Sequence, residues 1–169
     1  MYGRAWMAVD GVEIEHPNRK KASSKATRAI VVVLLVASAL VMAAISLGAW
    51  NELVGAKALQ VIYIVVYLGM AYLVTRWSRG VLPVVAALAI VLSIFALVSA
   101  PGWFERDKPG FDDPALSADV VGLLVALLVP LQLLLIGFAV RGFQQAWNVE
   151  VEHPVQRGGQ ATGPTPAPA

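Results

Sequence analysis

The chain has 169 residues, of which 58% are apolar and only 14% are charged, and its formal net charge is +2. A typical globular domain has roughly 25% charged residues, so this composition argues against an ordinary soluble domain. The chain contains no cysteine, which excludes disulfides, thiolate metal sites and thiol redox chemistry.

Residues 1–28 form a leader in which basic residues are concentrated just before the first apolar block. Five of them belong to this cluster: Arg19, Lys20, Lys21, Lys25 and Arg28. Basic residues that flank apolar blocks set membrane topology and bind anionic lipid head groups. We therefore expect these five side chains to lie at the membrane surface, and we expect no nucleic-acid partner.

Four apolar blocks follow the leader, and none of them contains Asp, Glu, Lys, Arg or His. They span about residues 29–50, 58–74, 81–100 and 120–140. Each block has about the 17–25 residues that a helix needs to cross the hydrocarbon core of a bilayer. The sequence therefore predicts an all-α membrane domain over residues 29–147, a four-transmembrane-helix bundle with antiparallel neighbours.

The connection between the second and third blocks, residues 76–80, is short enough to require a tight turn. It predicts that these two helices pack against each other as an antiparallel hairpin. Lysines and arginines also predict the orientation, because ten lie on the side of the termini and three on the other side. We expect both ends to be cytoplasmic, in a bacterial plasma membrane.

Aromatic residues mark the expected membrane boundaries. Trp50 and Trp103 fall at the boundary away from the termini, whereas Tyr72, Trp77 and Trp147 fall at the boundary near them. We expect these side chains to anchor the helices at the two interfaces.

The polar residues inside the blocks are few. In the second block, Gln60, Tyr63 and Tyr67 recur at helical spacing on one face. They could line a groove, although a packing seam with hydrogen bonds to neighbouring helices is the favoured interpretation. In the fourth block, Pro130 predicts a kink, and Gln132 is close enough in sequence to satisfy polar groups that the kink would free.

A six-residue motif occurs once before the first block and once after the last. Residues 12–17 read VEIEHP and residues 149–154 read VEVEHP. The alternation predicts two short strands that pair beside the bundle, with aliphatic side chains toward one side and glutamates toward the other. Glu15, His16, Glu152 and His153 are candidate metal ligands by residue type. Because neighbouring strand residues point to opposite faces, we expect no metal there.

The second motif copy belongs to a cytoplasmic segment over residues 148–157. Residues 158–169 are rich in Gly, Pro, Thr and Ala, which predicts a disordered tail.

Function follows mainly by exclusion. Pumps and proton-coupled carriers generally need an ionisable residue within the membrane, and the blocks contain none. We also find no nucleophile–base pair and no cofactor motif, so we expect no enzyme and no cofactor. The first hypothesis is a structural or accessory protein, a subunit or assembly partner of a larger membrane complex that binds a protein partner or further copies of itself. The alternative is a passive channel or small-solute transporter that acts as an oligomer.

Overall fold

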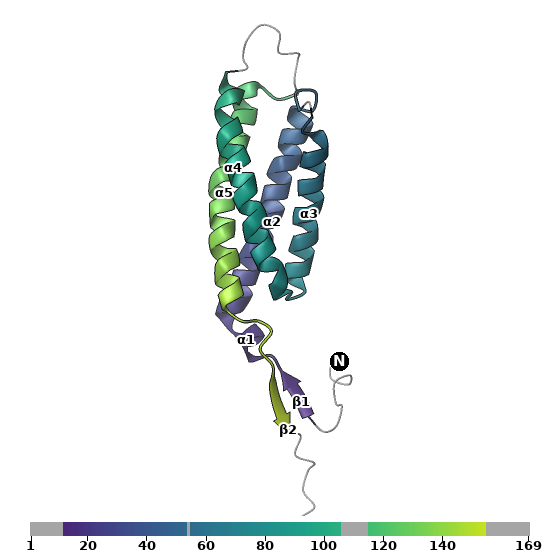
Figure 1. Ribbon diagram of the computed structural model, residues 1–169, viewed down its shortest axis with the longest axis vertical. Coiled ribbons are helices and arrows are strands. Elements are labelled where there is room, and N and C mark those ends of the chain that lie inside the picture. The colour runs from purple at the N-terminus through teal and green to yellow at the C-terminus, as the bar shows by residue number, and fades with distance from the viewer. Residues whose placement is uncertain (1–11, 54, 106–114, 155–169) are drawn as a thin grey trace, which may run out of the picture.

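A computed structural model describes residues 12–53, 55–105 and 115–154, and its main feature is a bundle of four long helices (Figure 1). They are α2 (Ala22–Gly48), α3 (Lys57–Thr75), α4 (Leu82–Phe104) and α5 (Ala118–Gln144). All four are long and apolar enough to cross a membrane, which confirms the four predicted apolar helices. Helix α2 begins before residue 29, so Lys25 and Arg28 belong to the helix and not to a separate leader.

Four short elements complete the described chain. They are β1 (Val12–Glu15), α1 (Pro17–Lys20), the 3-10 turn η1 (Arg79–Val81) and β2 (Val151–Pro154). The two strands pair with each other as an antiparallel ribbon that projects beyond one end of the bundle (Figure 1). The tail 158–169 lies outside the described residues.

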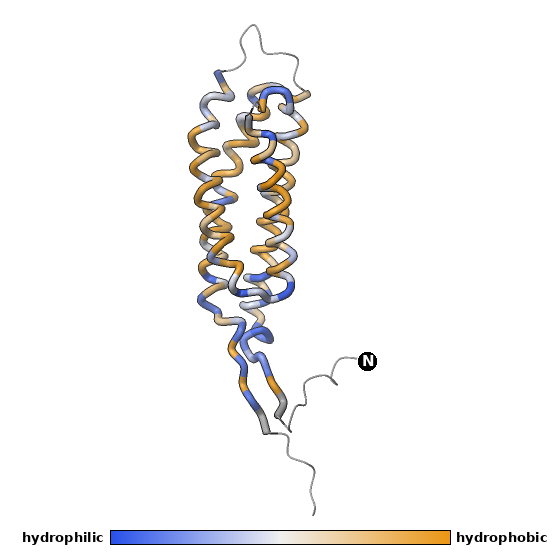
Figure 2. Tube along the Cα trace, turned by 45° about the vertical axis from the view of Figure 1, so that its right-hand side comes forward, coloured by the Kyte–Doolittle hydropathy of each residue, from blue (hydrophilic) through white to orange (hydrophobic). Residues whose placement is uncertain are grey.

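The two ends of the bundle are named here for what they hold. The strand end has the β1–β2 ribbon, α1, the turn between α3 and α4 and the end of α5. The loop end has the connection from α2 to α3 and residues 105 and 115–117 before α5. Apolar residues follow all four helices between these ends, and hydrophilic residues gather at the ends and in the ribbon (Figure 2).

The helices pack in the order α3, α2, α5, α4. Helix α4 packs most extensively on α5, and α2 packs on both α3 and α5. Helices α3 and α4 contact each other little, so the predicted hairpin packing of the second block against the third is wrong. A tight turn requires only that two helices meet at their joined ends. Helix α4 buries Ala89 and Ala96, and such small side chains let its backbone approach a neighbour closely.

The core of the bundle is narrow. Fully buried aliphatic side chains include Val31, Leu35, Val85 and Leu135, whereas many large apolar residues of every long helix are exposed. Such a continuous apolar surface is far larger than a soluble monomer normally exposes. This surface is suited to contact with the hydrocarbon of a bilayer.

Candidate functional site

A chain of buried polar side chains crosses the middle of the bundle. The Tyr67 hydroxyl donates a hydrogen bond to Gln132 Oε1 at 2.9 Å, and Gln132 Nε2 donates to Ser38 Oγ, also at 2.9 Å. All three residues have an exposed fraction of 0%. These two hydrogen bonds join α3, α5 and α2. At Tyr67, the polar stripe of the second block is therefore a packing seam.

Gln132 differs from its expected role beside Pro130. Helix α5 continues through Pro130 without a break and ends only at Gln144. The hydrogen bonds of the Gln132 amide described above join it to α3 and α2, not to the backbone near Pro130. The residue therefore connects three helices, and the prediction that it satisfies polar groups near Pro130 is not supported by these contacts.

The strand end is organised around two tryptophans in contact, of which Trp147 is buried and Trp77 is half-buried. Trp147 has an exposed fraction of 0%, and its ring meets the ring of Trp77 edge-on with centroids 5.3 Å apart. The Arg28 guanidinium lies 4.1 Å from the centroid of the Trp77 ring. Trp147 Nε1 donates to Gln145 Oε1 at 3.0 Å. The expectation that Trp147 anchors the chain at a membrane interface is therefore wrong, because the end of α5 and its neighbours enclose the ring.

Polar side chains of the leader and of the α3–α4 turn donate hydrogen bonds to backbone carbonyls in the last turn of α5 and just after it. Arg19 Nε donates to the Trp147 carbonyl at 2.9 Å, and Asn18 Nδ2 donates to the Ala146 carbonyl at 3.0 Å. Arg79 Nε donates to the Phe143 carbonyl at 2.7 Å. These bonds join three separate parts of the chain at one place, which we call the Trp147 junction.

The backbone of the junction is conformationally demanding. Among the described residues, Trp77 (φ 63°) and Ala146 (φ 48°) are the two non-glycine residues with positive φ. Such conformations cost on the order of 1–3 kcal/mol each and persist where surrounding contacts enforce them. Trp77 packs on Trp147, and the Ala146 carbonyl accepts the bond from Asn18.

The ribbon confirms that the two motif copies pair, but with a different register. Ile14 lies opposite Glu152, and Glu15 lies opposite Val151. Each acidic residue of these pairs therefore has an aliphatic neighbour, and the predicted separation of aliphatic and acidic faces is wrong. A one-residue change of register between alternating strands is enough to make this difference. It also relieves the repulsion expected between glutamates placed opposite each other.

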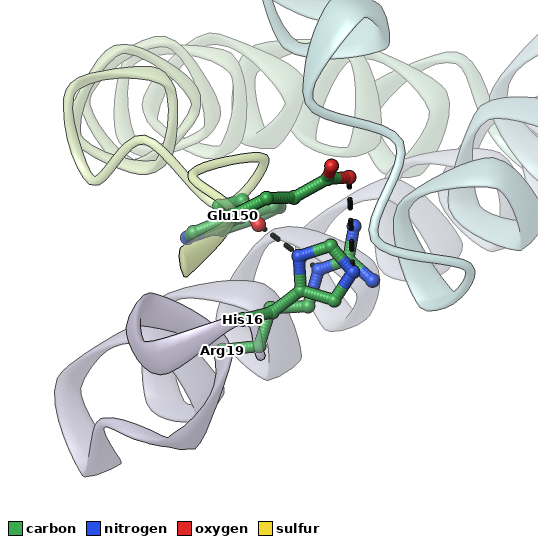
Figure 3. A network of polar contacts seen from close by, with 4 residues as sticks. His16, Arg19 and Glu150 are labelled. Carbon is green, nitrogen blue, oxygen red and sulfur yellow. Dashed lines mark hydrogen bonds and ion pairs between the residues drawn. The ribbon is translucent and has the colours of Figure 1, made fainter. Parts of the chain in front are cut away.

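The histidine of the first motif copy contacts an acidic residue of the second copy. His16 Nε2 lies 4.0 Å from Glu150 Oε1, and Figure 3 shows the two side chains facing each other beside Arg19. Glu15 forms an ion pair with Lys20. In residues 12–53, 55–105 and 115–154, no three His, Asp or Glu side chains form a group that could hold a metal ion. The His153 side chain lies outside the described part of the chain, so the absence of a metal at Glu15, His16, Glu152 and His153 stays a prediction.

A basic hollow of about 780 Å³ lies beside the ribbon at the strand end. Four of the five predicted membrane-surface residues line it, together with His16 and Trp77: Arg19, Lys20, Lys25 and Arg28. Lys21 is exposed and does not belong to the lining. The hollow combines several cationic groups in one place, which is the arrangement that binds anionic head groups.

A second cavity, the loop-end cleft, opens between α3 and α4 where these helices contact each other little. Its volume is about 300 Å³, and its lining includes Glu52, Gln60, Tyr63, Phe95, Ser99 and Trp103. Tyr63 packs on Tyr67 with ring centroids 5.8 Å apart, so the cleft ends near the buried hydrogen-bonded chain. At Gln60 and Tyr63 the polar stripe therefore lines a groove.

Comparison with protein families, curated proteins and solved structures gives no match for this chain.

The sequence-based analysis missed two features of the site. Glu52 was not singled out, because an acidic residue between two spans normally belongs to a solvated loop. The Trp147 junction was missed because its contacts join residues more than a hundred positions apart, such as Arg19 and Trp147. The repeated Ala-Trp pair before each motif copy (Ala5-Trp6 and Ala146-Trp147) was the one available signal.

Proposed function

We propose that this protein is an accessory subunit of a larger complex in the plasma membrane, with both ends in the cytoplasm. Four long helices, each with an apolar block that contains no charged residue, support the membrane location. The excess of lysine and arginine on the strand-end side supports the orientation. The basic hollow at the same end supports contact with anionic head groups of the cytoplasmic leaflet.

The β1–β2 ribbon is the observation that carries the accessory role. Among the described residues, each strand is paired along one edge only, and its other edge can accept a further strand. Ile14 and Val151 on the ribbon have exposed fractions of 39% and 38%. An isolated two-stranded sheet is marginally stable in water. A strand added from a partner protein would satisfy the open edges and cover the aliphatic side chains.

The Trp147 junction fits this role because it holds the base of the ribbon. Arg19 lies between β1 and α2, and it binds the carbonyl of Trp147 just before β2. The ion pair of Glu15 with Lys20 ties the end of β1 to α1. The ribbon is thereby presented in a fixed position relative to the bundle, as a docking element requires.

A ribbon variant tests the proposal. Proline at position 151 removes a backbone N–H from β2 and disturbs the pairing with Glu15. Native mass spectrometry after mild detergent extraction from the membranes of the native host should show wild-type protein in an assembly larger than the monomer. Val151→Pro should release the monomer. Val151→Thr, which keeps a β-branched residue, should stay assembled. A monomeric wild-type protein, or an intact assembly of Val151→Pro, would contradict the proposal.

Thiol labelling tests the orientation, because the chain has no native cysteine. Cysteines introduced singly at the exposed positions Ala22 and Ala115 lie at opposite ends of the bundle. In intact cells, a membrane-impermeant reagent should label Ala115→Cys and leave Ala22→Cys unlabelled. Both positions should react after the membrane is made permeable. The reverse pattern in intact cells would show that the strand end faces outward.

A passive channel is the second candidate function, and the loop-end cleft is the observation in its favour. The cleft enters the bundle from one end and leads toward Tyr67. The buried Tyr67–Gln132–Ser38 chain lies across the rest of the route. A pore would therefore need this chain to separate, and replacement of Gln132 by Ala would then increase solute flux into proteoliposomes.

A further inference from the structure

The loop-end cleft has the size and the walls of a small ligand site. Its volume of about 300 Å³ lies at the lower limit of the roughly 300–1,000 Å³ found for ligand pockets. Aromatic side chains from α3 and α4 form part of its walls, namely Tyr63, Phe95 and Trp103. Because α3 and α4 contact each other little, a molecule dissolved in the bilayer can enter from the side.

Polar and apolar groups are separated along the cleft. Glu52 lies in the connection before α3, and Gln60 follows in the first turns of that helix. Met42, Leu92 and Leu128 line the part that is farther from the loop end. A ligand that matches this arrangement has a polar head at the loop end and a hydrocarbon chain toward the middle of the bundle.

The charge of the cleft defines the head. Among the described residues, Glu52 is the one acidic or basic side chain in the lining, and its carboxylate has no ion pair with any of them. The nearby Lys57 ammonium lies over the Trp50 ring, 5.1 Å from its centroid. A carboxylate bordered by aromatic rings favours a cation, through ionic attraction and through cation–π contact.

We propose that the loop-end cleft binds an amphiphile with an ammonium head and a single hydrocarbon chain. The head lies at Glu52 near the membrane surface, and the chain extends between α3 and α4 toward Leu92 and Leu128. This inference rests on the membrane location of the bundle. It does not depend on an accessory role or on a partner at the ribbon.

Binding of matched probes tests the charge preference. Purified full-length protein in lipid nanodiscs is titrated with radiolabelled dodecyltrimethylammonium, and binding to empty nanodiscs is subtracted. Dodecyl sulfate has the same chain with an anionic head, so it serves as the comparison. Binding of the ammonium probe should saturate at one site per chain. Dodecyl sulfate should not compete for that site.

Variants then locate the site. Glu52→Gln should weaken binding of the ammonium probe about tenfold or more, because the quaternary head has no N–H donor and depends on ionic attraction to the carboxylate. Glu105→Gln is the matched control, since Glu105 is an exposed acid at the same end of the bundle and does not line the cleft. It should leave the affinity unchanged. Ser99→Phe, at an exposed lining position, should block the cleft and abolish binding while the thermal unfolding temperature stays near that of the wild type.

Three outcomes would overturn the proposal. The first is equal affinity of wild type and Glu52→Gln for the ammonium probe. The second is the same loss in Glu105→Gln as in Glu52→Gln, which would indicate general surface attraction. The third is absence of saturable binding to the wild type, the result expected if a segment of the chain itself occupies the cleft.

Discussion

The two ends of the bundle are built in contrasting ways. At the strand end, the Trp147 junction joins the leader, the α3–α4 turn and the end of α5 through hydrogen bonds and an edge-on contact of two rings. At the loop end, α3 and α4 contact each other little, and a cleft whose lining includes the Glu52 carboxylate lies between them. Among the described residues, the ion pairs also belong to the strand end. From this difference, we expect the contacts at the strand end to contribute more to the stability of the fold than those around the cleft.

The basic residues illustrate the same difference. Arg19 and Arg28 were expected to contact lipid head groups, and they also donate hydrogen bonds to the backbone carbonyls of Trp147 and Thr75. At the loop end, the basic residue in the described part of the chain is Lys57. Its ammonium group lies over the exposed ring of Trp50. Basic residues that we expected at the membrane surface therefore contribute to the tertiary structure of the strand end.

The largest expected effect comes from removal of the buried tryptophan. Trp147→Ala leaves a cavity beside Trp77, so we expect the free energy of unfolding to fall by about 3–5 kcal/mol. Trp50→Ala is the matched change at the loop end, where the ring is 45% exposed. It should cost less than about 1 kcal/mol. Denaturant titration in mixed micelles measures both values. Equal losses at the two ends would contradict the proposed division of roles.

A smaller effect is expected from Arg79. Its guanidinium donates to the Phe143 carbonyl and to Asn148 Oδ1, at 2.7 and 2.9 Å. Arg79→Lys keeps the charge but loses the forked geometry, and it should lower the free energy of unfolding by about 1–2 kcal/mol.

Arg76→Lys is the control for this change because Arg76 belongs to the same turn and contacts the exposed Tyr72. We expect a change within about 0.5 kcal/mol. If both lysine variants were equally stable, charge alone would be sufficient at position 79, and the hydrogen bonds from Arg79 would contribute little.

The smallest effect comes from a comparison of two helical glycines with different surroundings, one near each end of the bundle. Gly102 lies in α4 near the loop end, and a Cβ there would meet no atom within 4 Å. Gly102→Ala should therefore stabilise the protein by about 0.5–1 kcal/mol, the usual gain for alanine over glycine in a helix. A Cβ at Gly142 would lie 3.1 Å from both the Leu82 and the Trp147 side chains. Gly142→Ala should lose that gain. A stabilising Gly142→Ala variant would show that the Trp147 ring can move.

The sequence predicted the helices well because hydropathy and length determine which segments can cross a bilayer. It also predicted the pairing of β1 with β2, since the motif copies are nearly identical. The register was not predictable, because both strands alternate aliphatic and acidic residues. A shift of one residue places the aliphatic residues of one strand opposite either the aliphatic or the acidic residues of the other. The cleft was not predicted because the packing partner of α4 was not. Adjacency along the chain suggested that α3 packs on α4, whereas the best side-chain fit of α4 is with α5.

The pairing of β1 with β2 has a consequence for the order of events during synthesis. Glu15 emerges from the ribosome long before its partner Val151, and at about 5–20 residues per second the interval is on the order of ten seconds. All four long helices are made within that interval. The ribbon can therefore form only when the whole bundle has been synthesised, and a chain interrupted at any earlier point lacks it. A partner that recognises the paired strands would select full-length molecules and leave incomplete ones unbound.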